Sequence, residues 1–201
     1  MDRLIAALIL SYLIGSIPFS QIIAMLVKGV DLRAVGSRNV GGNNLIASAG
    51  TSWGIIGGGL DAAKGVAAIW LAQTLGAPYP WSLLCGLFAV AGHNWSPWLG
   101  FRGGKGIATG LGVLGFVSWP EAVIAALIFA VMNWRFIRNG TTATIIALVS
   151  LGVLYLITGK PLEVFLLGFG IAGLIYIASY NDLMATSKSA KHWTENFTIP
   201  K

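Results

Sequence analysis

The chain has 201 residues, of which 56% are hydrophobic and only 10% are charged, and its formal net charge is +6. Soluble globular domains carry about 25% charged residues, so this composition excludes an ordinary soluble domain. It predicts an all-α polytopic membrane protein, because a helix satisfies its own backbone hydrogen bonds in lipid. The Lys and Arg residues stand singly between apolar segments, which excludes a nucleic-acid-binding protein and indicates a membrane-topology signal instead.

Metal and disulfide chemistry are not expected. Cys85 is the single cysteine, and the two histidines, His93 and His192, lie far apart in the sequence. One thiol cannot form a disulfide framework, and isolated histidines lack the spacing of a metal site. We therefore expect neither a metal nor another cofactor.

Seven apolar segments follow one another, and we expect about seven transmembrane helices in one domain over residues 1–201. Pro18 should kink the first segment. Residues 45–60 are rich in Gly and Ser and are expected to form an interfacial segment ahead of the second span. Pro120 and Glu121 should turn the chain after the fourth span, and residues 183–201 should form a polar cytoplasmic tail. The expected spans cover residues 4–27, 61–75, 81–92, 107–119, 122–136, 143–157 and 163–180.

The basic residues predict the orientation. With seven spans, eleven of the thirteen Lys and Arg residues fall on one side of the membrane, and only Arg3 and Lys160 fall on the other. Basic loops face the cytoplasm, so we expect the N-terminus outside and the C-terminus inside. The polar loops gather on the same side, which indicates one composite site at the cytoplasmic face.

The loop over residues 92–106 is the most distinctive polar stretch. Gly103, Gly104 and Gly106 surround Lys105, and Arg102 precedes them. Exposed backbone amides beside a mobile ammonium suit a phosphate. The loop is not a Walker A motif, because Gly106 stands where that motif needs Ser or Thr. The alternative is a surface turn whose basic residues face lipid headgroups.

A second polar loop covers residues 36–44. Its Asn and Ser side chains could hold an uncharged carbonyl or share a phosphate, and its glycines expose backbone amides. The alternative is a plain turn, since these are also turn residues. Its candidate site residues are Ser37, Arg38, Asn39, Gly41 and Asn44.

Asp61, Lys64 and His93 are the remaining ionisable candidates. Asp61 and Lys64 are three residues apart, so they can pair on one helix face and avoid the cost of an unpaired charge in the membrane. That pair is either purely structural or the mouth of an anion site. His93, at an expected helix end, is either a hydrogen-bonded structural residue or part of an acyl-phosphate site.

Together these clusters resemble the PlsY-type family of acyl-phosphate:glycerol-3-phosphate acyltransferases, which are bacterial membrane enzymes. The resemblance covers most of the chain and rests on several separated motifs in the family's order. They are Gly15-Ser16-Ile17-Pro18, Asp31-Leu32-Arg33, Gly36-Ser37 with Asn39, Gly41 and Asn44, Asp61 with Lys64-Gly65, Gly92-His93 and residues 101–109.

The resemblance implies seven helices in the bacterial inner membrane, in contact with membrane lipid, and a site facing the cytoplasm. It also implies transfer of a fatty acyl group from acyl phosphate to the hydroxyl of glycerol 3-phosphate. The product would be lysophosphatidic acid, for phospholipid synthesis, and neither acyl-CoA nor acyl carrier protein would be needed.

In such an enzyme the phosphate would bind Lys105, Arg102 and the amides of Gly103 and Gly104. Ser37 and Asn39 would orient the carbonyl and its developing oxyanion. The acceptor proton could pass to His93 or to the departing phosphate. The other candidate substrate-binding residues are Arg38, Gly41, Asn44, Asp61, Lys64, Gly106, Arg138, Thr141, Thr144 and Asn181.

The chain departs from the family pattern at several positions. Ala47 stands where the family has an arginine, Ser179 where a histidine is usual, and Arg38 where a glycine is usual. Thr141 and Thr144 stand in place of serines. We hypothesise that Arg38 replaces the missing arginine. The alternatives are a paralogue with another acyl acceptor, or a non-catalytic membrane protein with a relict anion site.

Overall fold

The computed structural model describes residues 2–137 and 140–196, with side chains except those of Ile137, Thr141 and residues 181–196. All regular structure in these residues is helical, which confirms the predicted all-α class. The elements are α1 (Asp2–Ser16), α2 (Phe19–Lys28), α3 (Gly42–Ala49), α4 (Thr51–Thr74), α5 (Leu83–Asn94), η1 (Pro97–Leu99), α6 (Ile107–Val117), α7 (Trp119–Val131), η2 (Met132–Ile137), α8 (Gly140–Ile157) and α9 (Leu162–Asn196).

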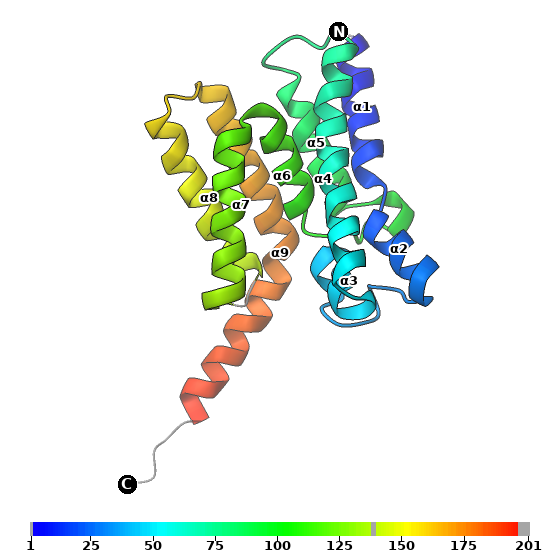
Figure 1. The fold of residues 1–201 in the computed structure, drawn as a ribbon, viewed down its shortest axis with the longest axis vertical. Helices are drawn as coiled ribbons and strands as arrows, with labels where there is room; N and C mark the ends of the chain where they lie inside the picture. The colour runs from blue at the N-terminus through cyan, green and yellow to red at the C-terminus, as the bar shows by residue number, and fades with distance from the viewer. Residues whose placement is uncertain (1, 138–139, 197–201) are drawn as a thin grey trace.

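The long helices run roughly along one direction and form two groups (Figure 1). In the first group α1 packs against α4 and α5; in the second α7 packs against α8, and α8 against α9. The packing of α4 on α6 and of α5 on α9 joins the groups. The short helices α2 and α3 lie at the end of the bundle opposite the N-terminus (Figure 1). The loops that carry the polar motifs therefore meet at that end.

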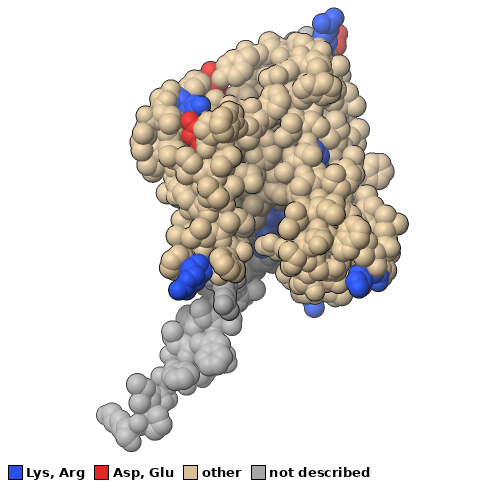
Figure 2. All heavy atoms as spheres, viewed as in Figure 1, with Lys and Arg blue, Asp and Glu red and all other residues tan. Residues whose placement is uncertain are grey.

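The outer surface suits a lipid environment. Large apolar side chains such as Leu127, Leu156 and Phe169 are at least 60% exposed, which a water-soluble monomer would rarely tolerate over so wide an area. Figure 2 shows charged side chains mainly near the two ends. Three segments are long and apolar enough to cross a membrane, Asp2–Lys28, Thr51–Thr74 and Leu162–Tyr180, and two shorter apolar helices accompany them.

The predicted kink at Pro18 is confirmed and separates α1 from α2. Proline has no N–H, so a helix that meets it leaves carbonyl oxygens without intrahelical donors. The hydroxyl of Ser96 donates to the carbonyl of Ser16 at 2.7 Å, and the ammonium of Lys64 donates to the carbonyl of Ile17 at 2.8 Å. The break therefore fastens α1 both to α4 and to the loop after α5.

Lys64 also pairs with Asp61 one turn earlier on α4. Lys64 Nζ lies 2.9 Å from Asp61 Oδ1, and both side chains are 2% exposed. The hydroxyl of Ser20, on α2, donates to the other carboxylate oxygen at 2.8 Å. Each charge therefore has a partner and an additional hydrogen bond, which a buried ion pair needs to persist.

The predicted start of the second span was wrong. We placed it at residue 61, after an interfacial segment over residues 45–60, whereas α4 begins at Thr51 and α3 occupies most of the earlier part. Glycines lower the mean hydropathy of this segment, but they allow α4 to pack closely on α3. Gly54 packs on Ile46, and Gly57 packs on Leu45. The ion pair consequently lies well inside a 24-residue helix, not at its mouth.

Two other predicted boundaries also differ. Pro120 and Glu121 lie in the first turn of α7, not in a turn between spans, because proline fits a first helical turn, where its missing N–H removes no intrahelical hydrogen bond. The tail was expected to be separate from the last span, but α9 continues without a break to Asn196.

Close helix crossings depend on glycine. A side-chain carbon at Gly112 on α6 would collide with the backbone of Ala62 on α4, and one at Gly65 would collide with the backbone of Thr109. These reciprocal contacts explain Gly65 and Gly112 as helix packing in the membrane, and Gly110, where a side-chain carbon would collide with Ile171, packs on α9.

The Asp61–Lys64 pair should be critical for stability. Lys64→Met leaves Asp61 buried without a counter-charge, so we expect a loss of about 3–5 kcal/mol in unfolding free energy. Thermal unfolding in detergent measures it, with Lys28→Met, at an exposed position, as the control. The double variant Asp61→Asn, Lys64→Met should recover part of the loss. Equal midpoints for Lys64→Met and the control would contradict the assignment.

Candidate active site

Asn44 organises the loop that precedes α3. Its side-chain amide nitrogen lies 2.9–3.1 Å from the carbonyl oxygens of Leu32, Val35 and Asn39, and its side-chain oxygen accepts the backbone N–H of Ser37 at 3.2 Å. The side chain is buried. A single residue thus closes residues 32–39 into a compact loop, so Asn44 has a structural role in this geometry.

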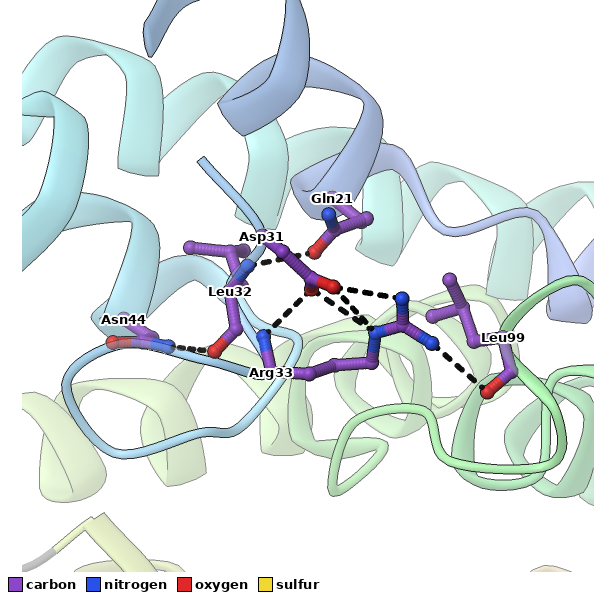
Figure 3. A network of polar contacts seen from close by, with 6 residues as sticks. All are labelled: Gln21, Asp31, Leu32, Arg33, Asn44 and Leu99. Carbon is purple, nitrogen blue, oxygen red and sulfur yellow. Dashed lines mark hydrogen bonds and ion pairs between the residues drawn. The ribbon is translucent and has the colours of Figure 1, made fainter. Parts of the chain in front are cut away.

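The beginning of the same loop is held by an exposed ion pair (Figure 3). Arg33 Nη2 lies 2.7 Å from Asp31 Oδ2, and this hydrogen-bonded guanidinium holds the pKa of Asp31 below its ordinary value. Because the folded-state pKa is lowered, the contact persists at neutral pH and is lost only in acid. Arg33 also donates to the carbonyl of Leu99 at 3.3 Å, and the side-chain oxygen of Gln21 accepts the backbone N–H of Leu32.

The glycine loop after η1 is fixed by the end of α5. The last carbonyls of a helix have no intrahelical partner, and here those of His93 and Asn94 accept the N–H groups of Gly104 and Gly103 at 3.1 and 3.0 Å. These two amides are therefore engaged within the protein, contrary to the expectation that they bind phosphate. Any phosphate at this loop would depend mainly on side chains.

His93 lies between the buried ion pair and the glycine loop. Its Nδ1 is 3.7 Å from Asp61 Oδ1, and its Nε2 faces Gly104 so closely that a side-chain carbon there would collide with it. The imidazole is buried. It therefore lies against both α4 and the loop that carries Lys105.

A cavity of about 320 Å³ opens beside this cluster. Its polar end is lined by Asn39, Asp61, His93 and Lys105. The rest of its wall is formed mainly by apolar residues of α6, α7, α8 and α9. The volume lies in the range of small-molecule sites, and the combination of a few polar groups with apolar walls is typical of them.

The predicted site residues fall into two groups. Those that line the cavity are Asn39, Gly41, Asp61, His93, Lys105, Gly106 and Thr144. Those that do not are Ser37, Arg38, Asn44, Lys64, Arg102, Gly103 and Gly104. In the second group, Ser37, Arg38 and Arg102 are exposed, whereas Asn44 and Lys64 are buried and bonded to the backbone.

Three predicted residues cannot be placed in this way. Arg138 lies outside the described residues, and the side chains of Thr141 and Asn181 are not among those described. At two of the positions that depart from the family pattern, Ala47 is exposed on α3 and Ser179 is buried on α9. Neither lines the cavity.

Most of the cavity wall is apolar, and its residues were not among those predicted from the sequence. Ala122, Ala125, Ala126 and Phe129 line it along α7. Their spacing of three and four residues puts them on one helix face, and three small residues on that face could have indicated a groove. A search for polar and ionisable motifs could not identify these residues, because their side chains carry no polar group.

Comparisons with known proteins agree with this arrangement. Residues 5–186 match the family model described as "Glycerol-3-phosphate acyltransferase". "Glycerol-3-phosphate acyltransferase 1" of Deinococcus radiodurans is 40% identical over 155 residues, 77% of each chain. "Glycerol-3-phosphate acyltransferase" of Synechococcus sp. (strain JA-3-3Ab) is 36% identical over 177 residues, 88% of this chain and 85% of that protein.

Solved structures show the same likeness. The crystal structure of PlsY (YgiH), an integral membrane glycerol 3-phosphate acyltransferase, in its glycerol 3-phosphate form, superposes with a TM-score of 0.82 at 34% identity over 92% of both chains. Its lysophosphatidic acid form gives a TM-score of 0.81 at 32% identity. The family match extends over nearly all of the described chain. The chain therefore belongs to the glycerol-3-phosphate acyltransferase family of integral membrane enzymes.

Proposed function

We propose that this enzyme takes its acyl group from an acyl phosphate and transfers it to the hydroxyl of glycerol 3-phosphate, giving lysophosphatidic acid, at the cytoplasmic face of a bacterial inner membrane. One observation carries the choice of donor. A single cavity joins Lys105, His93 and Asn39 to a long apolar wall, and an acyl phosphate has this division into an anionic head and a hydrocarbon tail.

The acyl–phosphate bond is already activated, so the enzyme mainly has to place the acceptor hydroxyl against the acyl carbonyl. The acceptor oxygen attacks the carbonyl carbon, the bond from that carbon to the phosphate oxygen breaks, and phosphate leaves with the electron pair. Lys105 at the polar end stabilises the departing phosphate electrostatically. Asn39, which is half-buried and lines the cavity, orients the carbonyl, with Ser37 exposed nearby in the same loop.

The surroundings of His93 support a positioning role. One ring nitrogen faces Asp61, and the other faces the backbone of Gly104. We therefore assign the acceptor proton to the departing phosphate, a base that the donor itself provides. The pH profile of His93→Gln tests this assignment: lower activity with an unchanged profile supports positioning, and loss of a titration limb contradicts it.

The proposed activity is measured by phosphate release from an acyl phosphate, with and without glycerol 3-phosphate, in purified protein. We expect release to depend on the acceptor and lysophosphatidic acid to form in equal amount. Release with no effect of glycerol 3-phosphate would indicate another acceptor, and no release at all would contradict the proposal.

In the same assay Lys105 should matter more than Arg102. Lys105 lines the cavity, whereas Arg102 is exposed outside it. Removing one preorganised charge donor costs roughly 10²–10³ in rate, so Lys105→Ala should lower kcat by that factor with the protein still folded. Arg102→Ala should keep much of the activity. Equal losses in both variants would defeat the distinction.

Arg38 is proposed to contact the acceptor phosphate in place of the arginine missing at Ala47. Its backbone has φ +57°, the left-handed region where glycine is favoured. Arg38→Gly therefore removes the guanidinium without backbone strain, and we expect a large rise in the KM for glycerol 3-phosphate with a smaller change for the donor. Steady-state kinetics measure both constants, with Lys28→Ala as control.

The complementary variant sharpens this test. If Arg38 compensates for Ala47, adding Ala47→Arg to Arg38→Gly should restore the KM. An unchanged KM in Arg38→Gly would reject the compensation.

The orientation can be tested independently. We propose seven transmembrane segments with the N-terminus outside, from the distribution of basic residues. A C-terminal fusion to a reporter active only in the cytoplasm should be active, and one to a reporter active only outside should be silent. The reverse pattern would contradict the proposed cytoplasmic site.

A further inference from the structure

The apolar half of the cavity has a regular construction. Small side chains from two facing helices leave the space open: Ala122, Ala125 and Ala126 on α7, and Ala147 on α8. On the third side Leu111 and Leu114 of α6 close the wall. A hydrocarbon chain that starts at Lys105 can therefore run along α6 between α7 and α8.

The cavity ends at a defined level. Its deepest lining residues are Leu114 on α6, Ala122 on α7 and Leu151 on α8. Ser118, the residue that joins α6 to α7, stands four residues after Leu114 and four before Ala122, and Tyr155 stands one helical turn beyond Leu151. The junction of α6 and α7 and the next turn of α8 therefore meet at the same place.

That next turn is polar and buried. The hydroxyls of Ser118 and Tyr155 are 2.7 Å apart and hydrogen-bonded, and both residues are 2% exposed. Glu121, also on this level, pairs with Lys160 at 3.2 Å. A hydrocarbon chain that extended further would have to separate buried polar groups from their hydrogen-bonding partners. The free-energy cost of leaving these groups unpaired exceeds the gain from the added apolar contact.

We propose that this wall is an acyl-chain gauge, in which the Ser118–Tyr155 pair marks the end of the chain that the enzyme prefers. The gauge rests on the proposed acyl-phosphate donor. It assigns specificity to residues that the acyl-transfer chemistry does not use: the alanines of α7 and α8 form the sides, and Leu114 and Leu151 form the last apolar layer before the polar stop.

The length of the gauge follows from helix geometry. From Ile107 to Ser118 a helix rises about 16 Å at about 1.5 Å per residue. An extended chain of single bonds advances about 1.2 Å per bond, as an extended peptide does, so the gauge holds roughly 13 bonds. The preferred donor is therefore tetradecanoyl phosphate, whose 14 carbons are joined by about 13 bonds.

The test compares kcat/KM for a series of acyl phosphates from decanoyl to octadecanoyl. Ala125→Phe fills the cavity, and we expect the ratio of hexadecanoyl to decanoyl activity to fall at least tenfold, since each methylene kept out of an apolar site costs about fourfold and two together cost about 16-fold. The KM for glycerol 3-phosphate should not change. Ile124→Phe is the matched control, because Ile124 is the preceding residue on α7, 43% exposed and outside the cavity wall.

Leu114→Ala provides the opposite change and carries the test alone if Ala125→Phe does not fold. It removes part of the last apolar layer, so octadecanoyl activity should rise several-fold relative to tetradecanoyl. An unchanged chain-length profile in the folded variants, or an equal shift in Ile124→Phe, would overturn the gauge. A wild-type enzyme that consumes no acyl phosphate of any length would instead overturn the proposed function.

Discussion

The structure depends on the buried ion pair between Asp61 and Lys64. Lys64 donates to the Ile17 carbonyl at the break before Pro18, and Asp61 accepts a hydrogen bond from Ser20 beyond that break. The same carboxylate faces His93, whose backbone carbonyl holds the glycine loop. A charge pair in a membrane helix is costly. Here the pair joins three polypeptide segments at one point, so the same contacts that stabilise the charges also fix the positions of these segments.

The cavity results from this anchoring together with small side chains. Glycines let α4 and α6 approach at backbone distance, and alanines on α7 keep the second group of helices from filling the space beside α6. One end of the cavity therefore contains charged and amide groups, and the other contains only hydrocarbon until Ser118. An acyltransferase that joins a fatty acyl chain to a water-soluble acceptor needs this gradient of polarity.

The sequence predicted the helical class, the kink at Pro18 and the gathering of polar motifs, because apolar length, proline and residue chemistry act locally. It misplaced the start of α4, since glycines that look weakly apolar serve close packing on α3. It also assigned phosphate to the amides of Gly103 and Gly104, which the C-terminal carbonyls of α5 occupy. Such long-range hydrogen bonds depend on which helices become neighbours, and so does the alanine-lined cavity wall of α7. A local sequence pattern does not show which helices will pack together.

In the proposed binding mode Lys105 holds the donor's phosphate, and the donor's acyl chain lies along α6 between α7 and α8. The most direct measurement is a structure of the protein bound to a non-hydrolysable acyl phosphonate. We expect the phosphonate beside Lys105 and Asn39 and the acyl chain against Ala125, with its end short of the Ser118–Tyr155 pair. A chain lying in the apolar groove between α8 and α9, which is lined by Val149, Gly152 and Phe169, or a phosphonate away from Lys105, would contradict it.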